Sequence, residues 1–398
     1  MKILQVVSSF APAYAYGGPA RSTYKISKSL TQLGHNVTVY TTDAYDADER
    51  FNDEKHGIPM EELNVHRFRN VNNTLAYEYN LCLAPGMTTK LKRNIKNFDI
   101  VHIEEFRTPQ AEFARRYATK AGIPYILQTR GAVPRTLRPK QKWLFDKISG
   151  EKLFEDASRI IATSESESNR YFDVFPDTDP NKLEHIQNGV DLEIYQDPPR
   201  KGGFRTRYGI DPDVPVVLFV GRLDDMKGVD LLIDAFKEVR KQIPTAELFL
   251  VGPDDGLQNT LERQVSTLDL EEFIHFIGPL YNKSKLEAYV DADLFVLPSK
   301  YRYESFGNVV IEAMACETAV VLTEKCGAAE WIPSDAGRTI AAKPDGISEG
   351  IIQILNDDDL RAEMASNGRD LVLKKFYWSA VAEEIEEIYC EVINKEHP

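Results

Sequence analysis

The segment PVVLFVGRLDDMKG, residues 215–228, is an apolar run followed directly by a loop with a glycine at each end. Such a wholly apolar run is typical of a strand buried on both faces of a parallel sheet. Further strand-like runs follow it, and helices are predicted over 229–242, 257–268 and 283–291. Apolar strands that alternate with helices predict a doubly wound α/β domain.

The first half of the chain shows the same alternation. Its strand-like runs are KILQVVS (2–8), HNVTVYTT (35–42), FDIVHIE (98–104), IPYILQTR (123–130), RIIATS (159–164) and LEHIQNGVD (183–191). A segment rich in proline, glycine and charge, 188–210, predicts a linker. We therefore expect an N-terminal Rossmann-like domain over 1–195, a second one over 196–375, and a deep cleft between them. An amphipathic helix over 376–398 is expected to cross back to the first domain.

Composition narrows the function classes. The 398 residues are 42% hydrophobic and 28% charged, with a net charge of -14, which argues against a nucleic-acid partner. No apolar run approaches the ~20 residues that a membrane span needs. The four cysteines are scattered and fit a cytoplasmic location without a structural metal; they are Cys82, Cys316, Cys326 and Cys390.

Two basic stretches stand out against the acidic average. Residues 130–147 interleave cations with Leu137, Trp143, Leu144 and Phe145, and a second basic patch covers 90–98. Both could be solvated faces. The alternative is an anionic membrane surface as a partner of 130–147, which would place the protein on the inner face of the cell membrane.

The stretch YESFGNVVIEAMA, residues 303–315, places Glu304 and Glu312 eight positions apart. Gly307 and Asn308 predict a loop that breaks there, with a helix beginning near them. A helix N-terminus favours negative charge because its N–H groups are unpaired and its dipole is positive. The arrangement suits a ligand with a phosphate in the middle and hydroxyl groups at both ends.

Two further loops after predicted strands offer phosphate contacts. Gly17 and Gly18 precede a helix, although a lone Gly-Gly is more often a turn. Arg222 and Lys227, between two glycines, can hold a diphosphate, with solvated cations as the alternative. The D-x-D pattern at Asp291 and Asp293 directly precedes a strand, so we assign it a structural role and predict no metal site.

These motifs in combination resemble the retaining glycosyltransferases of family 4. The matching segments are GRLDDMKG (221–228), LPSKYRYESFGNVVIEAMA (297–315), CGAAEWI (326–332), QNGVD (187–191) and DIVHI (99–103). Glu304 and Glu312 match the E-x7-E motif of that family. The resemblance covers essentially the whole chain. It implies the two-domain GT-B fold, with an acceptor-binding domain over 1–195 and a nucleotide-sugar-binding domain over 196–375.

The resemblance also implies roles for the site residues. Glu312 would bind the ribose hydroxyls, Glu304 the donor sugar, and Arg222 and Lys227 the diphosphate, while the backbone of Ser305, Phe306, Gly307 and Asn308 would lie along phosphate and sugar. It implies a metal-independent transfer without a cofactor, from a UDP-sugar rather than a GDP-sugar. The acceptor would be a glycan or a lipid-linked glycan of surface polysaccharide biosynthesis.

The chain departs from the family pattern in the first domain. Arg130 stands where relatives often carry a sugar-contacting histidine, so we include it among the catalytic candidates. Its guanidinium could meet a uronic acid or, with Arg135, Arg138, Lys140 and Lys142, a lipid phosphate. His102 matches a different position of the family pattern, and Glu104 stands where a second histidine is common. Two other functions stay open, a sugar-nucleotide epimerase or hydrolase of the same architecture and a non-catalytic nucleotide-sugar binder.

Overall fold

The computed structural model describes residues 1–16, 18–56, 63–79, 81–135, 138–301 and 304–396. The chain forms two compact units. One contains Met1–Asn188 together with Trp378–Pro398, and the other contains Gly189–Tyr377. The divisions predicted from the sequence lay near these, at 195 and 375.

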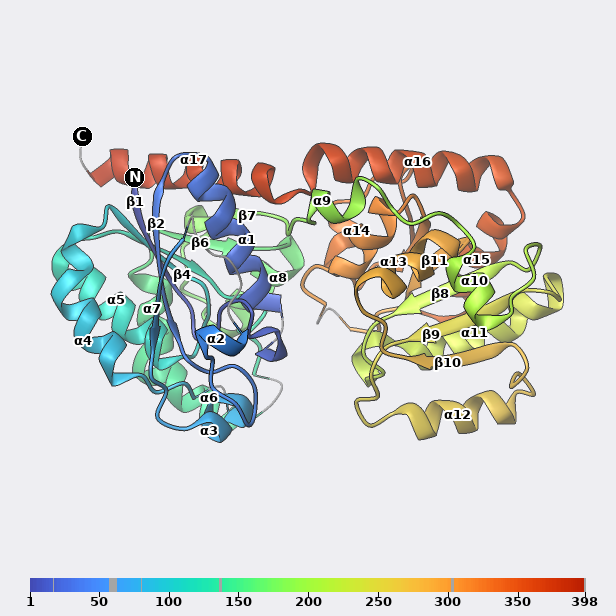
Figure 1. Cartoon of the computed structure of the whole chain (residues 1–398), viewed down its shortest axis with the longest axis horizontal. Coiled ribbons are helices and arrows are strands. Elements are labelled where there is room, and N and C mark those ends of the chain that lie inside the picture. The colour runs from blue at the N-terminus through green and yellow to red at the C-terminus, as the bar shows by residue number, and fades with distance from the viewer. Residues whose placement is uncertain (17, 57–62, 80, 136–137, 302–303, 397–398) are drawn as a thin grey trace. The chain divides into compact units, whose positions relative to one another are not determined.

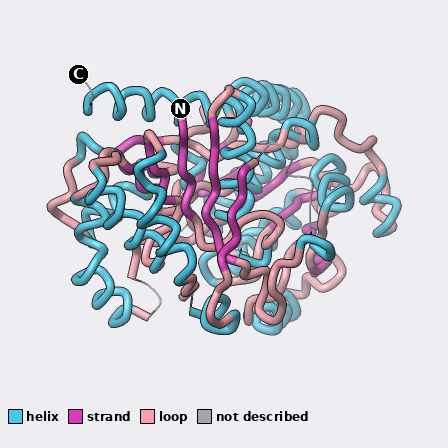
Figure 2. The backbone as a smooth tube through the Cα atoms, turned by 60° about the vertical axis from the view of Figure 1, so that its left-hand side comes forward, coloured by secondary structure: helices cyan, strands magenta, loops and turns pink. Residues whose placement is uncertain are grey.

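The first unit is built on a seven-stranded sheet with the order β3-β2-β1-β4-β5-β6-β7. Its strands are β1 (Lys2–Val6), β2 (Asn36–Thr42), β3 (Asn64–Phe68), β4 (Ile100–Ile103), β5 (Tyr125–Gln128), β6 (Arg159–Ala162) and β7 (Leu183–His185). All of the pairs are parallel. Figure 2 shows β1, which starts at the N-terminus, beside its neighbours in this sheet.

Helices cover both faces of this sheet, which explains why its central strands, β1, β4, β5 and β6, are largely apolar (Figure 1). The helices are α1 (Gly18–Gln32), α2 (Asp53–His56), α3 (Asn73–Tyr79), α4 (Pro85–Asn94), α5 (Pro109–Ala121), α6 (Pro139–Phe145), α7 (Glu151–Glu155), α8 (Glu165–Val174) and α17 (Trp378–Glu396). Successive residues of β1 point to opposite faces. Ile3 packs in the cluster with α1 and α17, whereas Leu4 packs with α4 and α5.

The second unit has a six-stranded parallel sheet with the order β10-β9-β8-β11-β12-β13. The strands are β8 (Val216–Val220), β9 (Glu247–Val251), β10 (Ile274–Gly278), β11 (Leu294–Leu297), β12 (Ala319–Thr323) and β13 (Arg338–Ile340). The helices are α9 (Leu192–Tyr195), α10 (Gly203–Tyr208), α11 (Val229–Gln242), α12 (Gln258–Thr267), α13 (Asn282–Asp291), α14 (Asn308–Ala315), α15 (Pro344–Leu355) and α16 (Asp358–Lys375). β8 is buried along its whole length, as the opening segment predicted.

Three strands were not identified from the sequence. β3 and β13 are edge strands without fully buried residues, so they lack the apolar run that marks the others. β12 follows an apolar helix after only a short turn, so its pattern merges with that of α14. The predicted linker 188–210 is also more ordered than expected, because α10 lies within it and buries Phe204.

Among the described residues, no helix is long and apolar enough to cross a membrane.

Candidate functional site

Two loops of the second unit meet because they follow neighbouring strands. Arg222 and Lys227 follow β8, and Glu304 follows β11, which pairs with β8 in parallel. Gly228 adopts φ of 68°, and a Cβ atom there would clash with the carbonyl oxygen of Pro298. The backbone N–H of Lys300 also donates to the carbonyl of Met226 at 3.1 Å. A glycine at 228 therefore allows the two loops to lie against each other.

The acidic and basic candidates form ion pairs across these loops. The ammonium group of Lys227 donates to Glu304 Oε2, and the two side chains are 18% and 21% exposed. Arg222, 53% exposed, pairs with Asp224 at 3.0 Å and Asp255 at 2.5 Å. A cation and a carboxylate are thus held within reach of one ligand. Of the predicted cations, Lys227 is the one in contact with a predicted carboxylate.

The loop that carries Glu304 rests on the third motif, CGAAEWI. The N–H of Gly327 donates to the carbonyl of Glu304 at 2.9 Å, and the N–H of Ala328 donates to that of Phe306 at 2.6 Å. Phe306 itself is buried. This motif therefore fixes the backbone of residues 304–306, a structural role that the sequence pattern alone did not reveal.

Helix α14 begins at Asn308, which confirms the predicted break in the loop. Gly307 precedes it with φ of 94°, and a Cβ atom there would lie 2.7 Å from Cys326 Sγ. Asn308 is exposed, whereas Val310 and Ile311 are buried in the core. The N-terminus of the helix, where its dipole is positive, therefore follows the Glu304 loop directly.

Glu312 is held on α14 by two side chains of α13 that the sequence reasoning missed. Lys285 Nζ lies 2.8 Å from Glu312 Oε2, and the hydroxyl of Tyr289 donates to the same oxygen at 2.9 Å. Burial, and then the charge of Glu312, raise the pKa of Tyr289 well above its usual value. Lys285 and Tyr289 are four positions apart and share one face of α13. The sequence predicts that Lys285 and Tyr289 share a face of α13, but it does not indicate that this face packs against α14.

The two aspartates of the D-x-D pattern serve the fold, as predicted. Asp291 accepts hydrogen bonds from the backbone N–H groups of Gly202, Phe204 and Arg205 at the start of α10. Asp293 accepts from the N–H of Val216 and pairs with Arg205. In the part of the chain that the structure describes, no three His, Cys, Asp or Glu side chains are grouped as a metal site would require.

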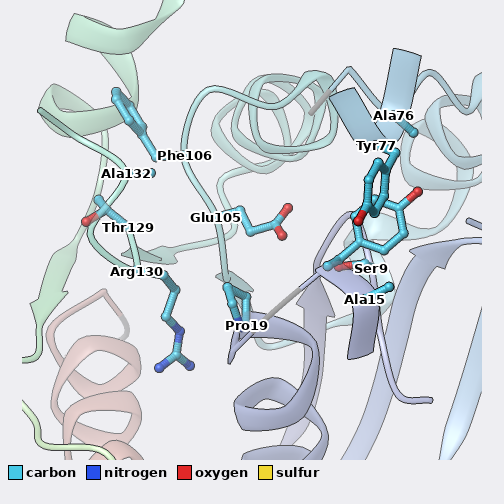
Figure 3. A pocket seen from close by; sticks show the side chains of 11 residues that line it. Ser9, Ala15, Pro19, Ala76, Tyr77, Glu105, Phe106, Thr129, Arg130 and Ala132 are labelled. Carbon is cyan, nitrogen blue, oxygen red and sulfur yellow. The ribbon is translucent and has the colours of Figure 1, made fainter. Parts of the chain in front are cut away.

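The first unit has a pocket of about 430 Å³ at the carboxyl ends of β1, β4 and β5 (Figure 3). In parallel sheets this edge is where ligands bind. The lining residues are Ser9, Ala15, Tyr16, Pro19, Ala76, Tyr77, Glu105, Phe106, Thr129, Arg130 and Ala132. Of the predicted Gly-Gly pair, Gly17 lies outside the described residues and Gly18 is the first residue of α1.

Arg130 lines this pocket, but its guanidinium is already engaged. Nε and Nη2 donate to Glu104 Oε2 at 3.0 and 2.6 Å, and Nη1 donates to Asn188 Oδ1 at 3.2 Å. Its backbone has φ of 53°, an uncommon conformation for a residue with a side chain. The carboxylate of Glu104 therefore neutralises the charge that Arg130 brings to the pocket.

His102, on β4, is not among the residues that line the pocket. It is fully buried, and its Nδ1 forms a hydrogen bond with the hydroxyl of Tyr389 on α17 at 2.7 Å. Burial lowers the pKa of His102, so the ring is neutral at physiological pH. The structure gives His102 a packing role.

Glu105, next to Glu104, is the pocket residue that the sequence reasoning overlooked. The backbone N–H of Ser8 donates to Glu105 Oε2 at 3.0 Å. Burial raises the pKa of Glu105 to about 7. The signal available in the sequence was the position of Glu105 just after a buried strand, where side chains reach the ligand edge of the sheet.

The basic stretch 130–147 is largely committed to contacts within the first unit. Arg135 pairs with the buried Asp146 at 2.8 Å, Arg138 stacks 4.1 Å from the ring centre of Tyr79, and Lys142 donates to the carbonyl of Pro134 at 2.9 Å. Leu137 lies outside the described residues. Of the apolar residues predicted beside these cations, Trp143 (51%) and Leu144 (54%) are exposed, whereas Phe145 packs against the core of the first unit. Ile148 (67%), in the π-helix that follows α6, is exposed as well.

Comparisons with known proteins agree with this architecture. Residues 16–194 match the model described as Glycosyltransferase Family 4, and residues 202–371 match Glycosyl transferases group 1. An uncharacterized glycosyltransferase of Methanocaldococcus jannaschii is 27% identical over 398 residues, 98% of each chain. The phosphatidyl-myo-inositol mannosyltransferase of Mycolicibacterium smegmatis is 29% identical over 317 residues, 78% of this chain and 76% of that protein.

The fold is also found in solved structures. Anabaena HepE, in complex with UDP and glucose, superposes with a TM-score of 0.73 and 22% identity, and the match covers 98% of this chain and 100% of that chain. Each sheet of the present chain is parallel and covered by helices, as the GT-B architecture requires. The chain is therefore a glycosyltransferase that belongs to the group 1, family 4 enzymes and has the GT-B fold.

Proposed function

We propose that this enzyme is a retaining, metal-independent glycosyltransferase that moves a sugar from a nucleoside diphosphate, a UDP-sugar in preference to a GDP-sugar, to a glycan or lipid-linked acceptor. The observation that supports this most is the pairing of Lys227 with Glu304 beside the N-terminus of α14. A cation, a carboxylate and the positive end of a helix dipole then lie within one unit, and Glu312 is anchored further along the same helix. These groups match the phosphate and hydroxyl groups of a nucleotide sugar.

In this mechanism the diphosphate replaces Glu304 as the partner of Lys227, and Arg222 swings to the same anion from its exposed position. Glu304 is then released to accept hydrogen bonds from the donor sugar, while Glu312 accepts from the ribose. Cleavage of the anomeric bond places extra negative charge on the departing diphosphate. Fixed donors stabilise that charge without reorganisation. A metal is not required for this task, since Arg222, Lys227 and the helix N-terminus supply the positive charge.

The nucleotide preference and the acceptor dependence can be tested together. We expect UDP-sugars to raise the melting temperature more than GDP- or ADP-sugars, because a ligand that binds only the native state stabilises it. Excess EDTA should leave this shift and turnover unchanged. Donor consumption should depend on an added acceptor. Turnover without any acceptor would instead favour the epimerase or hydrolase, and a shift without turnover in the presence of a broad acceptor panel would favour the non-catalytic binder.

We further propose that α6 attaches the enzyme to an anionic membrane surface, on the cytoplasmic face, where surface polysaccharide precursors are assembled. Trp143, Leu144 and Ile148 supply exposed apolar surface. Lys140 adds exposed positive charge, and Lys147 is also exposed but is paired with Glu151 at 2.5 Å. Stable attachment requires two such signals together. The resemblance to a phosphatidyl-myo-inositol mannosyltransferase supports a lipid acceptor.

This attachment predicts co-sedimentation with anionic liposomes that weakens as salt screens the charges. Combined replacement of Trp143 and Leu144 by alanine should abolish binding, and reversal of Lys140 and Lys147 to glutamate should weaken it. Tyr281→Ala is the matched control, because Tyr281 is 68% exposed but lies in the other unit. If the wild-type protein stays in the supernatant at low salt, the stretch is a solvated face and the acceptor is soluble.

A further inference from the structure

The pocket of the first unit contains a carboxyl group whose role the donor chemistry does not explain. Glu105 lines the pocket together with Arg130 and Tyr77, all within one unit. In Figure 3 the carboxyl group of Glu105 is directed toward the side of the pocket that Tyr77 lines. The backbone N–H of Ser8 donates to one oxygen of this group. A ligand in the pocket can therefore approach a carboxylate directly.

The charges around Glu105 disfavour an anionic ligand. Glu104 and Arg130 cancel each other through two hydrogen bonds. The set of Glu104, Arg130 and Glu105 then carries a net negative charge when Glu105 is ionised and no net charge when Glu105 is protonated. Cys82, which also lies near Glu105, stays protonated, because burial raises the pKa of its thiol to about 12. Tyr16 stays neutral as well, because burial raises the pKa of its hydroxyl.

The opposite wall of the pocket is aromatic. Tyr77 is 47% exposed, and its ring meets that of Tyr16 edge to face with 5.6 Å between the centres. Tyr16 is fixed in turn by the carbonyl of Asp46, which accepts from its hydroxyl at 3.4 Å. A few polar groups opposite an apolar aromatic surface are typical of a small-molecule site. A sugar or polyol ring, apolar on its faces and hydroxylated at its edge, fits both walls.

We propose that Glu105 determines acceptor specificity: its carboxylate binds a hydroxyl group of a neutral sugar or polyol ring lying against Tyr77, and it rejects a ring that carries a carboxylate or phosphate there. This inference rests on the proposed transferase function, and it adds the chemical class of the acceptor. It also assigns Arg130 a different task from binding an anion, namely holding Glu104 in a neutral pair.

The binding should depend on pH in a defined direction. Hydroxyl groups donate stronger hydrogen bonds to an ionised carboxylate than to a neutral carboxyl group. Because burial raises the pKa of Glu105 to about 7, the ionised form dominates above that pH and is lost below it. Affinity for a neutral ring should therefore rise as the pH increases through 7, and binding should release a proton.

The test uses the full chain and small probes, read by NMR titration or calorimetry. The probes are methyl glycosides of glucose, mannose and galactose, with myo-inositol and, as the anionic match, methyl glucuronide. In the wild type we expect at least one neutral probe to bind about 5- to 10-fold more tightly at about pH 8 than at about pH 6, because the ionised fraction of a carboxyl group with a pKa of about 7 rises about 10-fold over that range. The glucuronide should bind more weakly than the matched glucoside.

Glu105→Gln removes the charge but keeps the shape. It should abolish both the pH dependence and the discrimination against the glucuronide, while Glu155→Gln, an exposed glutamate of α7 in the same unit, should behave as the wild type. Tyr77→Ala provides a second variant at an exposed position: it should weaken every ring probe and retain the pH dependence. Binding that is independent of pH, or a Glu105→Gln protein that still discriminates, would overturn the proposal, as would the failure of every neutral probe to bind.

The same proteins should be titrated with UDP and UDP-sugars. Loss of probe binding with intact nucleotide binding would reject the role of Glu105 and leave the proposed transferase function standing. Absence of nucleotide binding in the wild type would reject the donor assignment instead, whatever the probes do.

Discussion

Replacement of Lys227 or Arg222 by alanine is expected to reduce kcat by about 10²- to 10³-fold, the loss that follows removal of one preorganised donor to a developing negative charge, ~2.7–4 kcal/mol. Both side chains follow β8; Lys227 is paired with Glu304 in the loop before α14, whereas Arg222 is paired with Asp224 and Asp255. The effect on the free energy of unfolding should be small for Arg222, about 1 kcal/mol or less, because exposed ion pairs contribute little. It should be larger for Lys227, because its loss leaves the mostly buried Glu304 without its partner.

The measurement is steady-state turnover of the UDP-sugar, alongside the melting temperature of each variant. Lys237→Ala is the matched control, since Lys237 is an exposed lysine on α11 of the same unit. It should leave both quantities unchanged. Near-normal turnover in the Lys227 and Arg222 variants would show that neither cation holds the diphosphate, and the donor site would then have to be sought elsewhere.

The features that the sequence predicted well are those that depend on local physical rules. A wholly apolar run such as residues 216–220 removes all of its side chains from water only if the strand is buried on both faces, and β8 is buried throughout. The start of α14 could be placed because Gly307 adopts a conformation that other residues avoid. Strand order then brings Lys227 and Glu304 together, since the loops after β8 and β11 are neighbours.

The features that the sequence did not predict depend on which elements pack together. Nothing local to Lys285 indicates that α13 presents it to Glu312. The sequence likewise predicts that the cations of 130–147 are exposed to solvent or to a membrane, although Arg135 is paired with the buried Asp146. The sequence predicts Arg130 as a residue that binds an anion, because nothing in it shows that Glu104 pairs with Arg130. Ion pairs between loops of different strands form only in the folded protein. The net charge of a site depends on these pairs, so it cannot be predicted from the composition of one segment.

The two glutamates of the E-x7-E motif should fail in different ways. Glu312 is tied to α13 through Lys285 and Tyr289, which is how a side chain that orients a rigid nucleoside would be fixed. Glu312→Gln should therefore raise the Kd of free UDP by about 10- to 100-fold, the loss of hydrogen bonds to a charged acceptor. Tyr289→Phe should shift it in the same direction by less, because Lys285 still holds the carboxylate.

Glu304, in contrast, pairs with Lys227 and lies in the loop before the helix, so it can turn to the sugar once the diphosphate has taken that lysine. Glu304→Gln should leave the Kd of free UDP within about twofold of the wild type while lowering kcat by roughly 10²-fold, since a carboxylate facing the developing positive charge of the sugar acts in the transition state. Calorimetry with UDP and turnover with the UDP-sugar separate the two effects. Equal losses of UDP affinity in the two variants would contradict this division, because it would mean that both carboxylates contact the nucleotide and that neither is reserved for the sugar.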